Sequence, residues 1–589
     1  MKGLSRRDFL RVSGLAIGGV VVSTGLQGCL SGSGSSNRAE PAPTPVLRQV
    51  AFRHGVASGD PLADRVMIWT RVTPLDAQAD EIAVEWEVAA DAQFKDLLHN
   101  GSTRTGVARD YTVKIDVQNL EPGKRYHYRF ISNGVTSSAG SMKTLPASGV
   151  SQVRLAVLSC SNYPAGYFHV YAAAAREADV DAVVHLGDYI YEYAMGGYAT
   201  EDADALGRAL PADNDVEIIT LEDYRKRYAL YRTDADLQAL HAAAPMIAVW
   251  DDHEITNDTW RDGAENHNEG EGEFSERKLA ALQTYFEWMP IRPAAPDDEL
   301  TIYRSFDFGD LVSLHMLDTR VVGRDEQLSY GTYMTESGFD MQAFAADASD
   351  ASRTLLGQTQ MDWLQARLAN STATWQVLGQ QVLMGRMFLP AELLSSLTNP
   401  DADLVTRFTE LVQIKMRLEM NDPTLTPEEI ARVETVVPYN LDAWDGYAYE
   451  REVLLGLSRS LDKNLVVLAG DTHNAWASDL ETLDGSAVGV EFATASVSSP
   501  GLESYLAVPP EAVGQTEQVI TTLVDPLRYL NANQRGYLIV TFTDEQAQAD
   551  WRFVDTVKQR DYAMDDTRAK TLVTRIGAAN RRLISSGVF

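Results

Sequence analysis

Four short apolar runs in the 589-residue sequence each end in residues that can bind a metal ion. The runs cover positions 155–158, 181–186, 245–250 and 465–469. The residues that follow them include Cys160, Asp188, Tyr191, Asp252, His253, Asp471 and His473. Open α/β sheets place their chemistry just past the carboxyl ends of such strands. One polar ending arises easily by chance, but four in one chain favour a shared metal site.

The donor types indicate which cations such a site would hold. Asp188 and Tyr191 stand close together in the sequence, and both offer hard oxygen ligands. A phenol usually needs a strong Lewis acid, such as a ferric ion, to lose its proton near neutral pH. Calcium prefers oxygen ligands and would reject the sulfur of Cys160. A set of thiolate, phenolate, carboxylate and imidazole around one metal would be compatible with ferric iron.

The same motifs resemble a known family. Residues 187–191 read Gly-Asp-Tyr-Ile-Tyr, residues 249–254 read Val-Trp-Asp-Asp-His-Glu, and residues 470–473 read Gly-Asp-Thr-His. With a cysteine after the first run, they look like the PhoD-type alkaline phosphatases, which belong to the calcineurin-like and purple-acid-phosphatase-like metallophosphoesterases. The resemblance covers about residues 50–557. It implies an α/β fold: a four-layer α/β/β/α metallophosphoesterase sandwich, preceded by a β-sandwich domain.

The resemblance also implies a site that contains Fe³⁺ and Ca²⁺. Cys160, Asp188, Tyr191 and His473 would bind the ferric ion. Cys160 stands where related phosphoesterases have an aspartate, and Asp188 would bridge the ferric ion and the second metal.

The second metal is expected to be calcium. Asp252 and Asp471 would bind it, with Asn257 as a further candidate, and the choice between Asp252 and Asn257 stays open. The usual Gly-Asn-His-Asp/Glu motif of the superfamily reads Asp-Asp-His-Glu at 251–254, and the usual Gly-His-x-His reads Gly-Asp-Thr-His at 470–473. Both changes introduce carboxylates, which shifts the site from a transition metal towards calcium.

The predicted chemistry is hydrolysis by a metal-activated water without a covalent phospho-enzyme. His253 is the candidate for stabilising or protonating the leaving oxygen. Arg320 follows an apolar run at 311–317 and would hold the phosphoryl oxygens as a bidentate clamp, although a structural ion pair is an equal alternative.

The expected substrates are small-molecule phosphate esters, both monoesters and diesters, hydrolysed to acquire phosphate. An alternative is a dedicated phosphodiesterase of phospholipase D type, and pocket shape would decide between the two. A third reading is a non-catalytic surface lipoprotein that keeps the fold for binding. The full set of candidate ligands disfavours this third reading.

The charge balance excludes one class of partner. The chain has 83 acidic and 51 basic residues, a formal charge of −32. A stably held nucleic acid would require a basic surface, so we expect none. Bound cations can reverse the sign locally, and the acidity is therefore compatible with metal-mediated phosphate binding.

The N-terminus predicts export. Residues 5–10 read Ser-Arg-Arg-Asp-Phe-Leu, a twin-arginine pattern, and residues 1–28 form the expected signal for the twin-arginine translocation machinery. Cys29 ends a sequence that resembles a lipoprotein cleavage box, so a membrane tether and a soluble product stay open. Residues 29–45 are predicted to be a flexible linker. The expected location is the periplasm or the cell surface.

The remaining pattern predicts the domains. Short alternating strands at 46–146 indicate an Ig- or fibronectin-III-like β-sandwich. Residues 150–557 are the expected catalytic domain, with an inserted, mostly helical region at 390–439, and the polar tail at 558–589 is predicted to be helical. His54 and Asp60 in the first domain are weaker ligand candidates, for which a packed loop at the domain interface is the favoured interpretation.

Overall fold

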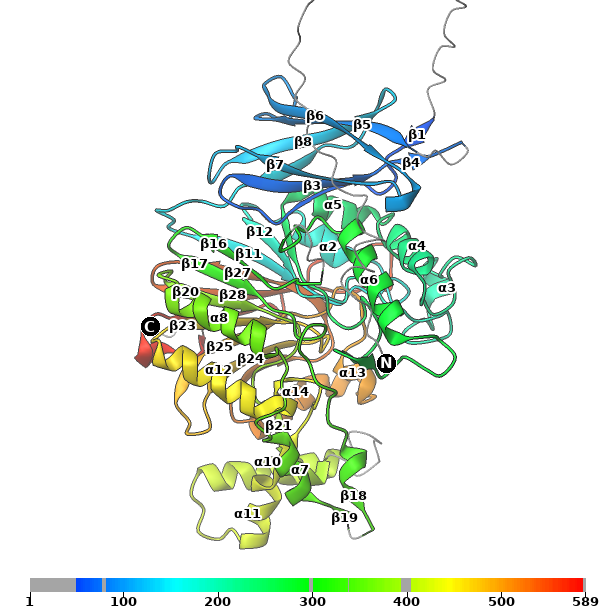
Figure 1. The fold of residues 1–589 in the computed structure, drawn as a ribbon. Coiled ribbons are helices and arrows are strands. Elements are labelled where there is room, and N and C mark those ends of the chain that lie inside the picture. The colour runs from blue at the N-terminus through cyan, green and yellow to red at the C-terminus, as the bar shows by residue number, and fades with distance from the viewer. Residues whose placement is uncertain (1–48, 77–80, 296–299, 337, 394–403, 586–589) are drawn as a thin grey trace, which may run out of the picture.

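The computed structural model describes residues 49–585 except 77–80, 296–299, 337 and 394–403 (Figure 1). The predicted export signal, Cys29 and the linker lie outside the described residues. Within the described part, no helix has the length and apolar character needed to span a membrane.

The N-terminal domain consists of two β layers. One layer is the sheet β10-β8-β5-β6, in which β9 pairs with β8. The other contains β2, β3 and β7, with the short pair β1 and β4 beside it. The bounds are β1 Val50–Ala51, β2 Val56–Gly59, β3 Arg65–Arg71, β4 Thr73–Pro74, β5 Ile82–Ala89, β6 Leu97–Thr105, β7 Thr112–Gln118, β8 Arg125–Ser132, β9 Val135–Thr136 and β10 Gly140–Lys143. Alternate residues of β5 and β8 point inward and pack with β3 and β7 in one apolar cluster, which confirms the predicted sandwich.

The sandwich is continuous with the catalytic domain rather than separate from it. β2 pairs with the catalytic strand β13 (Met246–Ala248) through Gly59 and Met246. A side chain at Gly59 would collide with backbone oxygens, 2.6 Å from that of Met246, so glycine permits this close approach. Strands β2, β3 and β7 therefore extend the first catalytic sheet.

The first catalytic sheet has a parallel centre. β11, β12 and β13 run parallel, and β27, β28, β29 and β30 continue the sheet antiparallel on the other side of β11. The bounds are β11 Val153–Leu158, β12 Ala182–His185, β27 Arg535–Phe542, β28 Gln546–Val554, β29 Lys570–Arg575 and β30 Ile584–Ser585. β12 is buried along its whole length, as its mostly apolar sequence predicts for a central parallel strand.

The second sheet has the order β16-β17-β20-β23-β25-β24-β26. Its strands β17, β20, β23 and β25 are parallel. The bounds are β16 Arg304–Phe308, β17 Val312–Met316, β20 Trp375–Gly379, β23 Asn464–Ala469, β24 Ala475–Glu481, β25 Ala487–Ala493 and β26 Leu527–Asn531. One apolar cluster contains residues of both sheets, which pack against each other. A parallel bridge between Ser159 and Ser496 also joins them.

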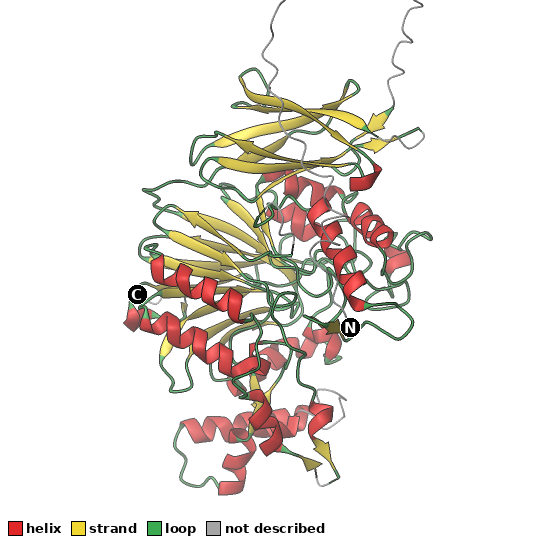
Figure 2. Ribbon diagram, in the orientation of Figure 1, coloured by secondary structure: helices red, strands yellow, loops and turns green. Residues whose placement is uncertain are grey.

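Helices cover the two outer faces, and the predicted four-layer sandwich is confirmed (Figures 1 and 2). α2 (His169–Ala174), α4 (Leu221–Tyr231), α5 (Ala235–Ala243) and α6 (Phe274–Trp288) lie on the side of the first sheet. α8 (Gln358–Asn370) and α12 (Ala448–Ser460) lie on the side of the second.

A mostly helical insertion projects from the second sheet, in agreement with the sequence. The strands β21 (Phe388–Pro390) and β22 (Val436–Pro438) pair as a two-stranded ribbon at its base. α10 (Leu404–Glu419) and α11 (Pro427–Glu434) lie between them in the chain and at the far end of the molecule (Figure 1).

The prediction of a helical C-terminal tail was wrong. Within the described part of 558–589, β29 pairs with β28 and β30 pairs with β29. Residues 571–574 read Thr-Leu-Val-Thr, three of which are β-branched, and Leu572 and Val573 are buried. An open edge of β28 offers such a segment hydrogen bonds and apolar contacts that an isolated polar helix would lack.

Candidate metal centre

The four predicted strand ends meet at one edge of the two facing sheets. β11, β12 and β13 are adjacent parallel strands, so the residues after them emerge side by side. β23 belongs to the second sheet, and Gly470 after it lies against Ser159 after β11, because a side chain at Gly470 would be 2.8 Å from the Ser159 hydroxyl oxygen. The facing sheets thus bring together segments separated by more than 300 positions in the chain.

Four of the predicted ligands share an unusual backbone. Cys160, Asp188, Asp471 and His473 have φ values of 63°, 55°, 63° and 63°, in the left-handed region. Such conformations cost energy for residues other than glycine and gather at functional sites, where the fold imposes them. The segment after each of these strands therefore makes a sharp turn, which directs the side chain of the candidate ligand into the site.

The first group consists of Cys160, Asp188 and His473, each of which offers a ligand atom within 4.8 Å of the others. The Tyr191 hydroxyl lies 3.0 Å from Asp188 Oδ2 and 3.0 Å from His473 Nε2. His473 Nδ1 lies 2.7 Å from the carbonyl oxygen of Pro500. When Nδ1 donates to this carbonyl, the lone pair of Nε2 is free to bind a metal. The structure thus brings all four predicted iron ligands together.

The chemistry of this group fits a strongly polarising cation. Burial, followed by the charge of Asp188, raises the pKa of the Cys160 thiol well above 9.0 and that of Tyr191 well above 10.0. Burial also raises the pKa of Asp188 to about 7. Without a cation the thiol and the phenol hold their protons, and Asp188 Oδ1 is a buried atom that has no hydrogen-bond partner among the described residues. A bound metal ion would satisfy this oxygen and stabilise the deprotonated thiol and phenol.

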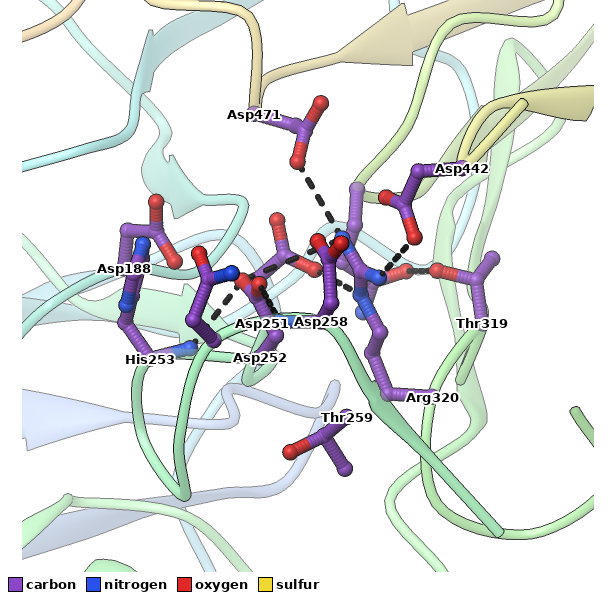
Figure 3. A network of polar contacts seen from close by, with 12 residues as sticks. Asp188, Asp251, Asp252, His253, Asp258, Thr259, Thr319, Arg320, Asp442 and Asp471 are labelled. Carbon is purple, nitrogen blue, oxygen red and sulfur yellow. Dashed lines mark hydrogen bonds and ion pairs between the residues drawn. The ribbon is translucent and has the colours of Figure 1, made fainter. Parts of the chain in front are cut away.

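A second group shares a member with the first, and a third group shares a member with the second (Figure 3). One is Asp188, Asp252 and His253, and the other is Asp251, Asp252 and Asp471. Asp188 belongs to two groups, as expected of a bridging ligand, and Asp252 links the second and third. Carboxylates dominate the second and third groups, which suits a hard cation.

Arg320 differs from its expected role as a phosphate clamp. Its guanidinium is fully buried, and it donates from Nε to Asp251 at 2.5 Å, from Nη1 to Asp442 at 2.8 Å and from Nη2 to Asp471 at 3.1 Å (Figure 3). Each nitrogen of the guanidinium thus has a carboxylate partner. This arrangement matches the second of the two roles expected from the sequence, a structural ion pair. Arg320 neutralises carboxylates that would otherwise repel one another.

The structure places Asp258, rather than the predicted ligand Asn257, beside the acidic group. The side-chain nitrogen of Asn257 donates to Glu265 at 2.9 Å, on the exposed side of the loop. The backbone nitrogen of Asp258 donates to Asp252 Oδ2 at 2.7 Å. Burial, with the charges of Asp442 and Asp252, raises the pKa of Asp258 to about 7, so its carboxylate faces the acidic group (Figure 3).

His253 lies beside the first group and carries a carboxylate partner that the sequence analysis missed. Its Nδ1 donates to Glu192 Oε2 at 2.7 Å, and its ring stacks on Tyr191 with centroids 4.2 Å apart. Glu192 is fully buried, and its Oε1 accepts from the backbone nitrogen of Asn257 at 2.9 Å. Burial lowers the pKa of His253, but Asp252, Glu192 and Asp188 outweigh it and raise the pKa well above 6.5. The imidazole is therefore held as a proton donor.

Other members of the site were also missed. Glu254 accepts from the backbone nitrogens of Asp188 at 3.0 Å and Asp251 at 2.8 Å, so it fixes two strand ends to each other. Glu254 and Asp251 flank predicted residues in the sequence and could have been found from that position. Asp442 follows the helical insertion, and no local pattern marks it.

The weaker candidates His54 and Asp60 lie outside the site, as the favoured interpretation held. Asp60 accepts from Arg304 Nη2 at 2.6 Å and Nε at 2.9 Å, across the boundary between the two domains. The His54 ring packs edge-on against Trp288, with centroids 5.2 Å apart.

The chain is similar to phosphatases of known sequence and structure. The sequence model of a family described as PhoD-like phosphatase matches residues 155–551, and the model of its N-terminal domain matches residues 37–146. The chain is 33% identical over 563 residues to alkaline phosphatase D of Bacillus subtilis (strain 168), covering 92% of this chain and 84% of that protein. A solved structure described as PhoD has 32% identity and a TM-score of 0.72, over 93% of this chain and 94% of that one. The chain therefore belongs to the PhoD-like phosphatase family and is a phosphoric ester hydrolase.

Proposed function

We propose that this chain is an exported, metal-dependent phosphatase that hydrolyses phosphate monoesters and diesters to acquire phosphate. The observation that carries the proposal is the convergence of Cys160, Asp188, Tyr191 and His473, with Asp188 shared by a neighbouring carboxylate group. Two adjacent sites of different ligand character are what a pair of unlike metal ions requires.

Fe³⁺ is the proposed occupant of the first group. A thiol, a phenol, a carboxylate and an imidazole surround it, and the first two become good ligands only beside a strong Lewis acid. Ca²⁺ is the proposed occupant beside it, held by Asp188, Asp252 and Asp471. When bound, these ions would neutralise the phosphate oxygens and activate the attacking water.

The chain's own contribution to the reaction is to hold a proton and to maintain the geometry. His253 would donate a proton from its ring to the leaving oxygen, and Glu192 fixes the tautomer by accepting from Nδ1. Arg320 would act as a positioning residue, because it holds Asp251 and Asp471 through one rigid guanidinium.

The proposed export rests on the N-terminal sequence. The twin-arginine pattern at 5–10 would direct the chain to the twin-arginine translocation machinery, and Cys29 would provide a lipid tether if the cleavage box is used. The site of action would be the periplasm or the cell surface.

The deciding experiment compares p-nitrophenyl phosphate with bis-p-nitrophenyl phosphate at alkaline pH with calcium. The protein is exported through its own signal, and its iron and calcium contents are measured. We expect turnover of both esters. Turnover of the diester alone would replace the proposal with a dedicated phosphodiesterase of phospholipase D type. Turnover of neither ester, with both metals present, would refute it.

Selective chelation distinguishes the role of calcium from that of iron. A calcium chelator should abolish turnover reversibly, while the visible absorption of the iron centre remains. Full activity in excess chelator would contradict a catalytic calcium ion.

A further inference from the structure

Three tyrosines form a continuous group on one side of the metal centre. We call Tyr193, Tyr198 and Tyr505 the tyrosine wall. Tyr193 and Tyr198 lie in the loop after β12, and their rings are 5.5 Å apart. Tyr505 ends the short helix α13 (Leu502–Tyr505), and its hydroxyl lies 2.8 Å from that of Tyr198. The fold thus joins two segments that are 300 positions apart.

The tyrosine wall contacts both histidines of the centre. The Tyr193 ring is 5.4 Å from the His253 ring, and the Tyr198 ring is stacked 6.3 Å from the His473 ring. If His253 protonates the leaving oxygen, the leaving group must lie within hydrogen-bond reach of this imidazole. The rest of the leaving group would therefore extend towards Tyr193.

The exposure of these rings differs from that of nearby tyrosines. Tyr505 is 53% exposed, and Tyr193 and Tyr198 are half-buried. In contrast, Tyr191 and Tyr189 are fully enclosed. Large apolar rings left open to solvent beside a buried polar site are typical of ligand recognition, in which a few polar groups orient the ligand and aromatic faces cover it.

The charges around the wall argue against a second anionic group. Arg535 lies close enough to Tyr198 for its charge to act on that phenol, but Arg535 donates from Nη2 to Glu503 at 2.7 Å. Its charge is therefore already compensated. The wall offers neutral, flat surfaces, which bind planar rings by stacking.

We propose that the tyrosine wall binds a planar aromatic leaving group, so that the enzyme prefers aryl and nucleoside phosphates to esters of open or purely aliphatic alcohols. This inference rests on the proposed phosphatase function and specifies its substrate class. Tyr505, the most exposed ring, stacks on the aromatic group, and Tyr193 lies along its path from His253.

Adenosine 5′-monophosphate and ribose 5-phosphate test this directly with the metal-loaded protein. Both esters release a primary alcohol from the same carbon of ribose, so the bond that breaks is the same, and only the base differs. We expect kcat/KM to be at least about fivefold higher for the nucleotide. Hydrolysis of both esters at equal kcat/KM would overturn the inference and leave the phosphatase proposal intact. Hydrolysis of neither ester, with p-nitrophenyl phosphate also inert, would refute the phosphatase proposal itself.

Variants of Tyr505 distinguish stacking of its ring on the substrate from a structural role of its hydroxyl contact with Tyr198. Tyr505→Ala removes the ring, and the ratio of the two kcat/KM values should fall towards one. Tyr505→Phe keeps the ring and loses only the hydroxyl contact with Tyr198, so the ratio should stay high. Tyr449→Ala is the matched control, because Tyr449 is 48% exposed on α12 at the outer face, and the ratio should not change. Equal loss of the ratio in Tyr505→Ala and Tyr505→Phe would overturn stacking as the cause.

Binding without hydrolysis gives an independent readout. Adenosine carries no phosphate and should inhibit competitively and quench tyrosine fluorescence, whereas ribose at the same concentration should do neither. Tyr505→Ala should abolish the effect of adenosine. Equal effects of adenosine and ribose on the wild-type protein would contradict the inference.

Discussion

Cys160, Asp188, Asp471 and His473 have left-handed backbone, and Gly187, just before Asp188, has a φ of 104°. Local sequence would not maintain four such turns, because each costs energy outside glycine. The packing of the two sheets imposes them, and Glu254 adds hydrogen bonds to the backbone of two strand ends. The fold as a whole therefore sets the backbone conformation of these four ligand candidates.

Replacement of Cys160 by alanine tests the proposed iron site. The variant should lose iron and the visible charge-transfer band, because the remaining ligands lack the thiolate. Metal analysis and an absorption spectrum measure this. Cys160 is fully buried, and alanine fits its space, so thermal unfolding of the metal-free protein serves as the control for folding. A spectrum like that of the wild-type protein would refute ligation of iron by Cys160.

Replacement of Glu192 by glutamine should shift the pH dependence of hydrolysis. The charge of Glu192 raises the pKa of His253, and the proton donor is lost as pH rises through that pKa. Without this charge the pKa falls, so the alkaline limb of the kcat profile should move to lower pH, with kcat reduced about tenfold or more. Glu265→Gln changes an exposed carboxylate that accepts a hydrogen bond from Asn257; it is the control and should leave the profile in place. If the alkaline limb does not move in Glu192→Gln, Glu192 does not control the pKa of the proton donor.

At the scale of elements, the site depends on how closely the strand ends approach each other. A side chain at Gly187 would lie 2.5 Å from the Cβ of Asp251, so the segment after β12 touches the segment after β13. The parallel register of β12 and β13 places these segments together. A slip of either strand would turn Asp188 or Asp252 away from the site.

Gly187→Ala should therefore destabilise the protein by about 2–4 kcal/mol and lower its metal content, since alanine both collides with Asp251 and disfavours a φ of 104°. Calorimetry and metal analysis would measure the two effects. Gly456→Ala in α12 is the matched control: a side chain there meets nothing within 4 Å, and alanine should stabilise the helix by about 0.5–1 kcal/mol. Equal unfolding temperatures for Gly187→Ala and the wild-type protein would show that the contact is not tight.

At the scale of the whole molecule, the β-sandwich is joined to the catalytic domain through a buried ion pair. Asp60 and Arg304 make two hydrogen bonds, and Arg292 donates from Nη1 to the Asp60 carbonyl oxygen at 2.8 Å. The pairing of β2 with β13 reinforces this junction. We infer that the two domains unfold together rather than independently.

Asp60→Asn should lower the free energy of unfolding by about 3–5 kcal/mol, because it leaves the largely buried charge of Arg304 without its partner. Asp64→Asn, which removes an exposed ion pair with Arg65, should change it by less than about 1 kcal/mol. Thermal unfolding would measure both variants. Two separate transitions in the wild-type protein would contradict cooperative unfolding of the domains.

The candidate ligands of the centre and the order of its elements could be predicted from the sequence. The candidate ligands follow apolar runs: Cys160, Asp188, Tyr191 and His473. The apolar pattern of a strand and the preference of a donor atom for certain metals are local properties, so both can be recognised from a short stretch of sequence. The β-sandwich and the helical insertion were predictable for the same reason, since alternation and helical spacing are written in contiguous residues.

The tertiary structure alone decided which residues face one another across the two sheets. The sequence left Arg320 open between a phosphate clamp and a structural ion pair, and in the fold it donates to carboxylates from three distant segments. Asp442 and the partnership of Glu192 with His253 have no local signature, and the tail from 558 pairs as strands because β28 presents an open edge. Such contacts depend on the packing of segments far apart in the chain, and no spacing within one segment encodes them.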